Sequence, residues 1–156
     1  MKPEEIKPDT ELCTILGFNA QTGNRRRYFN KILKKYECNA TAIALNIKEE
    51  HFIYTMNNLA ESKVTRMMID DEFQEATVNY CDVLDERSKV RNKVGFVEVV
   101  EGKIYGYNLD VLIDGLVENP DFFDENMTLA IRMMLLANRW YDTPIDLDII
   151  PIIVEK

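Results

Sequence analysis

The run Lys103–Asp110 ends in a carboxylate, which makes Asp110 the first candidate for chemistry in this chain. The run follows a turn at Glu101–Gly102 and a short apolar segment, so it is expected to be the second arm of a β-hairpin. A carboxylate placed at the end of a strand can serve as a general acid or base. Without a cationic partner, however, Asp110 would be a poor base at neutral pH. The alternative is that Asp110 caps a helix beginning at Val111.

Two arginines offer a second kind of chemistry, because a guanidinium binds a carboxylate or phosphate through two parallel hydrogen bonds. Arg25 and Arg132 are the candidates for such an anion site. The alternatives are that Arg25–Arg27 form a solvated helix face and that Arg132 pairs with a surface acid such as Asp124. His51 is the only histidine and is expected to be exposed, so the sequence predicts no metal site.

Length and composition fit one soluble domain spanning residues 1–156. The formal net charge of −8 argues against a nucleic-acid partner. Cys13, Cys38 and Cys81 contain no Cys-x-x-Cys spacing, which favours free thiols in a reducing compartment. The N-terminus does not resemble a signal peptide, and no apolar run is long enough to span a bilayer. These features predict a cytoplasmic protein without membrane contact.

Alternating apolar patterns then predict the elements that position these side chains. Strands are expected at 11–17, 41–47 and 64–69 and in a hairpin of 94–100 with 103–109; helices are expected at 24–36, 48–61, 73–91 with a break near Asn79, 110–117 and 126–141, followed by a segment at 147–154 that Pro151 interrupts. The β-α-β-α-β order favours parallel strands with right-handed crossovers. The predicted fold is a three-layer α-β-α domain with a mixed, mainly parallel sheet, a core at 10–110 and C-terminal helices at 111–156.

Several motifs resemble those of shikimate dehydrogenases. Gly106–Asp110 resembles the Gly-x-Asn-Thr-Asp run that delivers the catalytic aspartate in that family. The span Gly17–Asn30 lines up with the family's first strand-to-helix turn, Gly-Asn-Pro-x-x-His-Ser-x-Ser-Pro-x-x-His-Asn, and retains its first and last residues. Gly23 and Arg25 replace the two serines that hold the substrate carboxylate.

Two further segments carry the same resemblance. Lys63–Ile69 is similar to Asn-Val-Thr-x-Pro-x-Lys, with the valine and threonine retained and the catalytic lysine replaced by Ile69. Phe96 replaces a substrate-binding asparagine. In the last long helix Trp140 matches the family pattern, and Arg132 falls where the family has a substrate-contacting glutamine.

The resemblance implies a substrate-binding domain whose catalytic aspartate is Asp110. The ligand-binding residues that it implies are Arg25, Asn30, Lys63, Thr65, Asn108 and Arg132. The chain contains no Gly-x-Gly-x-x-Gly fingerprint, so no cofactor is expected in it. NADP would enter only through a partner that supplies a nucleotide-binding domain.

Three functions follow as hypotheses. The first is a binding module for a small anionic hydroxycarboxylic acid, which it does not turn over. The second is the substrate-domain half of a shikimate or quinate dehydrogenase that works with a separate NADP-binding chain, although the missing lysine weakens it. The third is an oligomeric interaction protein, a homodimer formed through apolar surface near Phe122 and Phe123.

Overall fold

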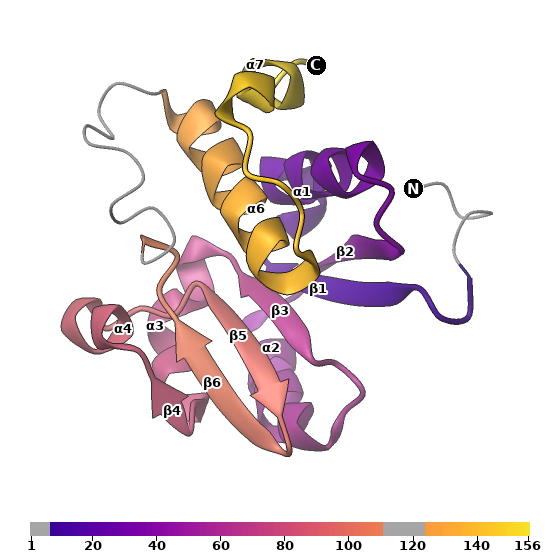
Figure 1. Ribbon diagram of the computed structural model, residues 1–156. Helices are drawn as coiled ribbons and strands as arrows, with labels where there is room; N and C mark the ends of the chain where they lie inside the picture. Colours follow the sequence, from indigo (N-terminus) through magenta and orange to yellow (C-terminus); the bar gives the residue numbers. More distant parts are fainter. Residues whose placement is uncertain (1–6, 111–123) are drawn as a thin grey trace.

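The computed structural model describes residues 7–110 and 124–156. Its centre is a six-stranded mixed sheet in the order β2-β1-β3-β5-β6-β4, with helices on both faces (Figure 1). The strands are β1 (Glu11–Gly17), β2 (Ala40–Asn46), β3 (Arg66–Ile69), β4 (Val83–Leu84), β5 (Phe96–Val100) and β6 (Lys103–Tyr107). The predicted three-layer α/β class with a mixed sheet is therefore confirmed.

Strand directions decide which loops meet. β1 pairs in parallel with β2 and β3, whereas β5 is antiparallel to both β3 and β6. β1, β3 and β6 consequently run the same way, and their carboxyl ends lie at one end of the sheet, which we call the carboxyl end. The opposite, amino end holds the starts of β1 and β3 and the end of β5.

The helices cover the sheet unequally. The α-helices are α1 (Asn24–Lys35), α2 (Glu49–Asn58), α3 (Gln74–Thr77), α4 (Glu86–Arg91), α6 (Glu125–Tyr141) and α7 (Ile150–Ile153). Short 3-10 turns are η2 (Ala20–Thr22), η3 (Leu59–Glu61), η4 (Asp71–Phe73), η5 (Val78–Tyr80) and η7 (Leu147–Ile149). α1 and α6 pack together on one face, and α2 lies on the other (Figure 1).

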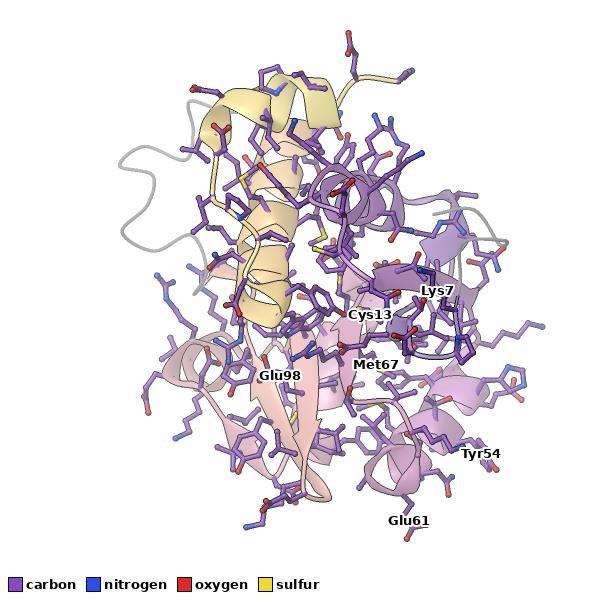
Figure 2. All side chains as sticks on the ribbon, turned by 45° about the vertical axis from the view of Figure 1, so that its right-hand side comes forward. Lys7, Cys13, Tyr54, Glu61, Met67 and Glu98 are labelled. Carbon is purple, nitrogen blue, oxygen red and sulfur yellow. The ribbon has the colours of Figure 1, made fainter. Side chains whose placement is uncertain are left out.

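Each face has its own core because strand side chains alternate between the faces. Cys13 lies in the cluster beneath α1 and α6, and Met67 lies in the cluster beneath α2. Both residues are inside the domain, whereas Tyr54 on α2 projects outward and is 72% exposed (Figure 2). All three cysteines are free. Within residues 7–110 and 124–156, no helix combines the length and apolar character needed to cross a membrane.

The predicted strands, the hairpin and the helices near 24–36, 48–61 and 126–141 are confirmed. The single helix predicted over 73–91 is wrong, because this segment forms α3, η5, the two-residue strand β4 and α4. Asp82 explains part of the break: its backbone donates to Ile104 O and its carboxylate accepts from Ile104 N, both at 2.8 Å. Asp85 then caps α4 by accepting from Ser88 N at 2.9 Å. Residues 111–117 of the helix predicted at 110–117 lie outside the described residues, as do Phe122 and Phe123.

Candidate functional site

A pocket of about 200 Å³ at the carboxyl end collects four of the predicted site residues. Arg25 lies in α1, which follows β1, and Asn108 and Asp110 follow β6. Arg132 comes from α6. The described residues that line it also include Asp71, Gln74, Arg91, Lys93 and Leu109. Loops at the carboxyl ends of parallel strands thus converge on one site, as is usual in α/β folds.

Asp110 lies between two guanidinium groups. Its Oδ1 is 2.7 Å from Arg132 Nη2, and its Oδ2 is 3.2 Å from Arg91 Nη1. The expectation of a carboxylate without a cationic partner is therefore wrong, and so is the alternative pairing of Arg132 with Asp124. The Asp124 carboxylate caps α6 instead, accepting from Met127 N at 2.7 Å. The Asp110 carboxylate is thus held from both sides by guanidinium groups.

Asn108 orients this carboxylate through the backbone. Its Oδ1 accepts from Asp110 N at 2.9 Å, and its Nδ2 donates to Lys93 O at 3.3 Å. Its own N–H donates to Asp85 Oδ1 at 3.3 Å. Asn108 thereby ties the end of β6 to the segment that precedes β5, and its amide group already has partners within the protein.

Arg25 is held on the other side of the pocket. Its Nη1 is 2.9 Å from Asp70 Oδ1 and its Nη2 is 3.3 Å from Asp71 Oδ1, with only 19% of the side chain exposed. The alternative of a solvated helix face is thus wrong for this arginine. Asp70 precedes the turn η4, but its side chain makes no cap bond to it. Burial raises the pKa of the Asp70 carboxyl, although Arg25 opposes the shift.

Gly17 makes room for Asp70. A methyl group at Gly17 would lie 2.6 Å from Asp70 Cγ and 2.7 Å from its Cβ, closer than atoms pack in proteins. Gly17, which matches the motif, is therefore required because Asp70, the partner of Arg25, lies against its backbone. The Nε atoms of Arg25 and Arg132 are buried and have no hydrogen-bond partner among the described residues.

The remaining predicted residues lie elsewhere. Asn30 binds the backbone of β2: its Oδ1 accepts from Ala42 N at 2.7 Å and its Nδ2 donates to Ala42 O at 3.0 Å. Lys63 and Thr65 precede β3, at the amino end of the sheet, and both are exposed. Neither residue is among the described residues that line the carboxyl-end pocket. Their proposed contacts with a ligand stay predictions.

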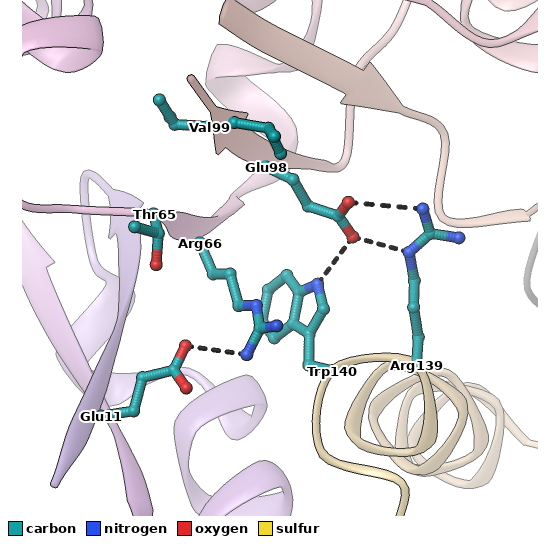
Figure 3. Close-up of a pocket in the computed structure, with 8 residues that line it drawn as sticks. Glu11, Thr65, Arg66, Glu98, Val99, Arg139 and Trp140 are labelled. Atoms are coloured by element: carbon teal, nitrogen blue, oxygen red, sulfur yellow. Dashed lines mark hydrogen bonds and ion pairs between the residues drawn. The ribbon is translucent and has the colours of Figure 1, made fainter. Parts of the chain in front are cut away.

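Thr65 lines a second pocket of about 510 Å³ at the amino end (Figure 3). Here Glu11 and Arg66 form a 2.8 Å ion pair, and Glu98 accepts from Arg139 Nε at 2.6 Å. Trp140 stands between the two pairs and donates from Nε1 to Glu98 Oε1 at 2.9 Å (Figure 3). Trp140, which matches the motif in the last long helix, therefore links α6 to β5 of the sheet through a hydrogen bond.

Sequence reasoning missed Arg91, Lys93, Asp71 and Gln74 as lining residues of the carboxyl-end pocket. Gln74 donates to Ile69 O at 3.0 Å and to Asp71 Oδ1 at 3.3 Å, which fixes the turn after β3. The predicted hairpin could have indicated Arg91 and Lys93. Because β5 is antiparallel to β6, it begins where β6 ends, so basic residues shortly before β5 must lie near the end of β6.

Comparison with known proteins gives the same fold. No protein-family model matches the chain. A curated relative, shikimate dehydrogenase (NADP(+)) of Aquifex aeolicus strain VF5, is 25% identical over 105 residues, which cover 67% of this chain and 39% of the relative. The crystal structure of shikimate dehydrogenase from Aquifex aeolicus superposes with a TM-score of 0.65 at 21% identity, covering 82% of this chain and 53% of that one.

The chain has a shikimate dehydrogenase-like α/β fold. Shikimate 5-dehydrogenase of Thermus thermophilus, solved with NADP(H) and shikimate, gives a TM-score of 0.58 at 16% identity and covers 64% of this chain and 38% of that one. The 5-ketofructose reductase of Gluconobacter sp. strain CHM43 gives 0.63 at 14% identity, with 73% and 43% covered. The resemblance predicted from the motifs is confirmed, and the chain spans about two fifths to one half of these proteins.

Proposed function

We propose that the carboxyl-end pocket binds a small anionic hydroxycarboxylic acid and does not turn it over. The observation that carries this proposal is the charge of the pocket: four cations (Arg25, Arg91, Lys93 and Arg132) line it with two carboxylates (Asp71 and Asp110). Even when Asp70, the partner of Arg25, is counted with them, one positive charge remains in excess, in a chain whose net charge is −8. An anion that enters the pocket would meet guanidinium groups already held in place by their acidic partners.

Two features support binding without turnover. Asp110 is paired with two guanidinium groups rather than with a lysine that could exchange a proton at neutral pH. The position that matches the family lysine in the motif is Ile69, which is fully buried in the core beneath α2. The pocket thus keeps groups that hold an acid and has lost a group that would help to oxidise a hydroxyl.

A second candidate is the substrate-domain half of an NADP-dependent dehydrogenase acting with a separate nucleotide-binding chain. The retained aspartate after β6, together with a fold shared with a protein solved with NADP(H) and shikimate, favours it. Such a half would show NADP-dependent oxidation of shikimate or quinate only when the partner chain is added. A homodimer in dilute solution remains the proposal for its assembly.

A thermal-shift titration tests the binding proposal. The panel contains shikimate, dehydroshikimate, quinate, phosphorylated and dicarboxylic analogues, and NADP. An acid present at about 100 times its Kd should stabilise the fold by roughly 2.7 kcal/mol. Arg132→Gln should weaken binding about tenfold or more, whereas the control Arg139→Gln, on the same helix but at the amino-end pocket, should not. A folded protein that shows no saturable shift with any acid would contradict the proposal.

A further inference from the structure

A third pocket lies on the α2 side of the carboxyl end and is unlike the other two. It has a volume of about 350 Å³ and is lined by aromatic and acidic side chains. We call it the aromatic groove and define it by Phe18, Phe52, Phe73, Tyr80, Glu49 and Glu72. Phe18 follows β1, Glu72 and Phe73 follow β3, and α2 supplies the facing wall.

The four rings of the groove form one continuous wall. Phe18 meets Phe73 edge-on with centroids 4.8 Å apart, and Phe73 stacks on Phe52 at 4.4 Å. Tyr80 meets Phe52 edge-on at 5.9 Å. Phe52 and Phe73 are buried and belong to the core beneath α2, so core packing explains them.

Core packing does not explain the outer part of the wall. Phe18 is 48% exposed, and Ile53 on the opposite side of the groove is 45% exposed. Large apolar side chains that flank a concave aromatic surface are characteristic of binding sites. The groove thus leaves apolar walls accessible to a ligand.

The charges of the groove specify what kind of ligand fits. Glu49 and Glu72 are its charged lining residues, and no cation lines it within the described part of the chain. Glu72 Oε1 accepts from Phe18 N at 2.6 Å, which fixes this carboxylate beside the rings. No ion pair among the described residues engages either glutamate, whereas the carboxylates of the other two pockets are ion-paired.

We infer that the aromatic groove binds an organic ammonium ion that carries an apolar group. The faces of aromatic rings attract cations, and this attraction underlies the recognition of alkylammonium ligands by aromatic cages. The two glutamates also attract the ammonium ion, because their charges are opposite to its own. The apolar group of the ligand would contact Phe18 and Ile53, and its ammonium group would lie at Glu49 and Glu72. This site is independent of the anion pocket and of the function proposed for it.

Isothermal titration calorimetry with three matched probes tests the inference. The probes are phenethylammonium, its uncharged counterpart 2-phenylethanol, and the anion phenylacetate. Phenethylammonium is expected to bind about fivefold more tightly than 2-phenylethanol, and phenylacetate is expected not to bind. Equal affinity for the ammonium ion and the alcohol, or no saturable binding of the ammonium ion, would overturn the inference.

Two variants and one control locate the site. Glu72→Gln keeps an oxygen that can accept from Phe18 N but removes one of the two charges, so the affinity for phenethylammonium should fall toward that for the alcohol. Phe18→Ala should weaken both probes. The control Glu75→Gln removes one charge from an exposed position of α3 that does not line the groove, and should leave both affinities unchanged. Equal losses for Glu72→Gln and Glu75→Gln would show a non-specific charge effect and reject the site. Circular dichroism melting establishes that each variant is folded.

Discussion

The two ends of the sheet carry the same kinds of charged residues in different balance. The amino-end pocket sets two carboxylates against two guanidinium groups, and each carboxylate is paired. The carboxyl-end pocket sets two lining carboxylates against four cations. A balanced set of paired charges is self-sufficient and stabilises the fold, whereas an unbalanced set favours an anion supplied from solution. Charge balance therefore separates a structural network from a candidate binding site better than residue type does.

The largest expected effect comes from filling the space beside Asp70. Gly17→Ala would push its methyl group into Asp70, so the ion pair with Arg25 should break and the free energy of unfolding should fall by about 2–3 kcal/mol. Urea unfolding measures the loss, and the acid that binds the parent protein should no longer bind. The control is Gly23→Ala, where the nearest atom would be 3.6 Å away. A loss of about 0.5 kcal/mol with binding intact is expected there; equal effects of the two variants would refute the steric argument.

Removing the hub of the amino-end network should affect stability alone. Glu98→Ala deletes the acceptor of Arg139 and of Trp140 Nε1, which should cost about 1–3 kcal/mol of unfolding free energy. Acid affinity at the other end should stay within about twofold of the parent value. Glu75→Ala, an exposed residue of α3, is the stability control. A large drop in acid affinity in Glu98→Ala would mean that the two ends are coupled, contrary to the comparison.

A change of charge at the rim of the carboxyl-end pocket should move affinity in the opposite direction. Asp71 lines this pocket with 86% of its side chain exposed and pairs with Arg25. Asp71→Asn should tighten acid binding about threefold at low salt, and the gain should shrink as salt screens the charge. Asp9→Asn, an exposed residue before β1, makes the same change in net charge and should have no effect. Unchanged or weaker binding by Asp71→Asn would count against an anion site.

The smallest effect concerns pH. Burial raises the pKa of Asp70 above its ordinary value of 3.8, so the folded protein retains this proton at pH values where the unfolded chain has released it. The contribution of Asp70 to stability is therefore full below pH 3.8 and declines as the pH rises through the folded-state pKa. Unfolding measured between about pH 3 and 7 should show a falling stability difference between the parent and Asp70→Asn. A difference that rises with pH would show that Arg25 outweighs burial.

Regular elements with long apolar patterns could be predicted from the sequence. The spacing of Tyr28, Phe29, Ile32 and Leu33 marks the buried face of α1, and the alternation in β1 places Cys13 and Ile15 on the face that α1 covers. The segment after β3 could not be predicted, because β4 has only two residues and depends on hydrogen bonds between Asp82 and Ile104, which are 22 residues apart.

The site was predictable in part for a similar reason. Motif order placed Arg25, Asn108, Asp110 and Arg132 near one another, and the structure brings them together. The partners of Asp110 were not predictable, since Arg91 and Arg132 reach it only through the direction of β5 and the packing of α6. A motif match alone is also insufficient: Thr65 has the residue type of the motif but lies just before β3, away from the carboxyl end.

Asn30 has a consequence for assembly. β2 is one of the two edge strands of the sheet, and its Ala42 N–H and C=O are both occupied by the amide of Asn30. The Asn30 side chain thus makes the pair of hydrogen bonds that one residue of an added strand would make. A neighbouring chain that tried to extend the sheet at β2 would have to displace both bonds, so this edge is guarded against strand addition. Association of copies by extension of the sheet is therefore disfavoured at this position of β2, because one asparagine already occupies the backbone groups of Ala42.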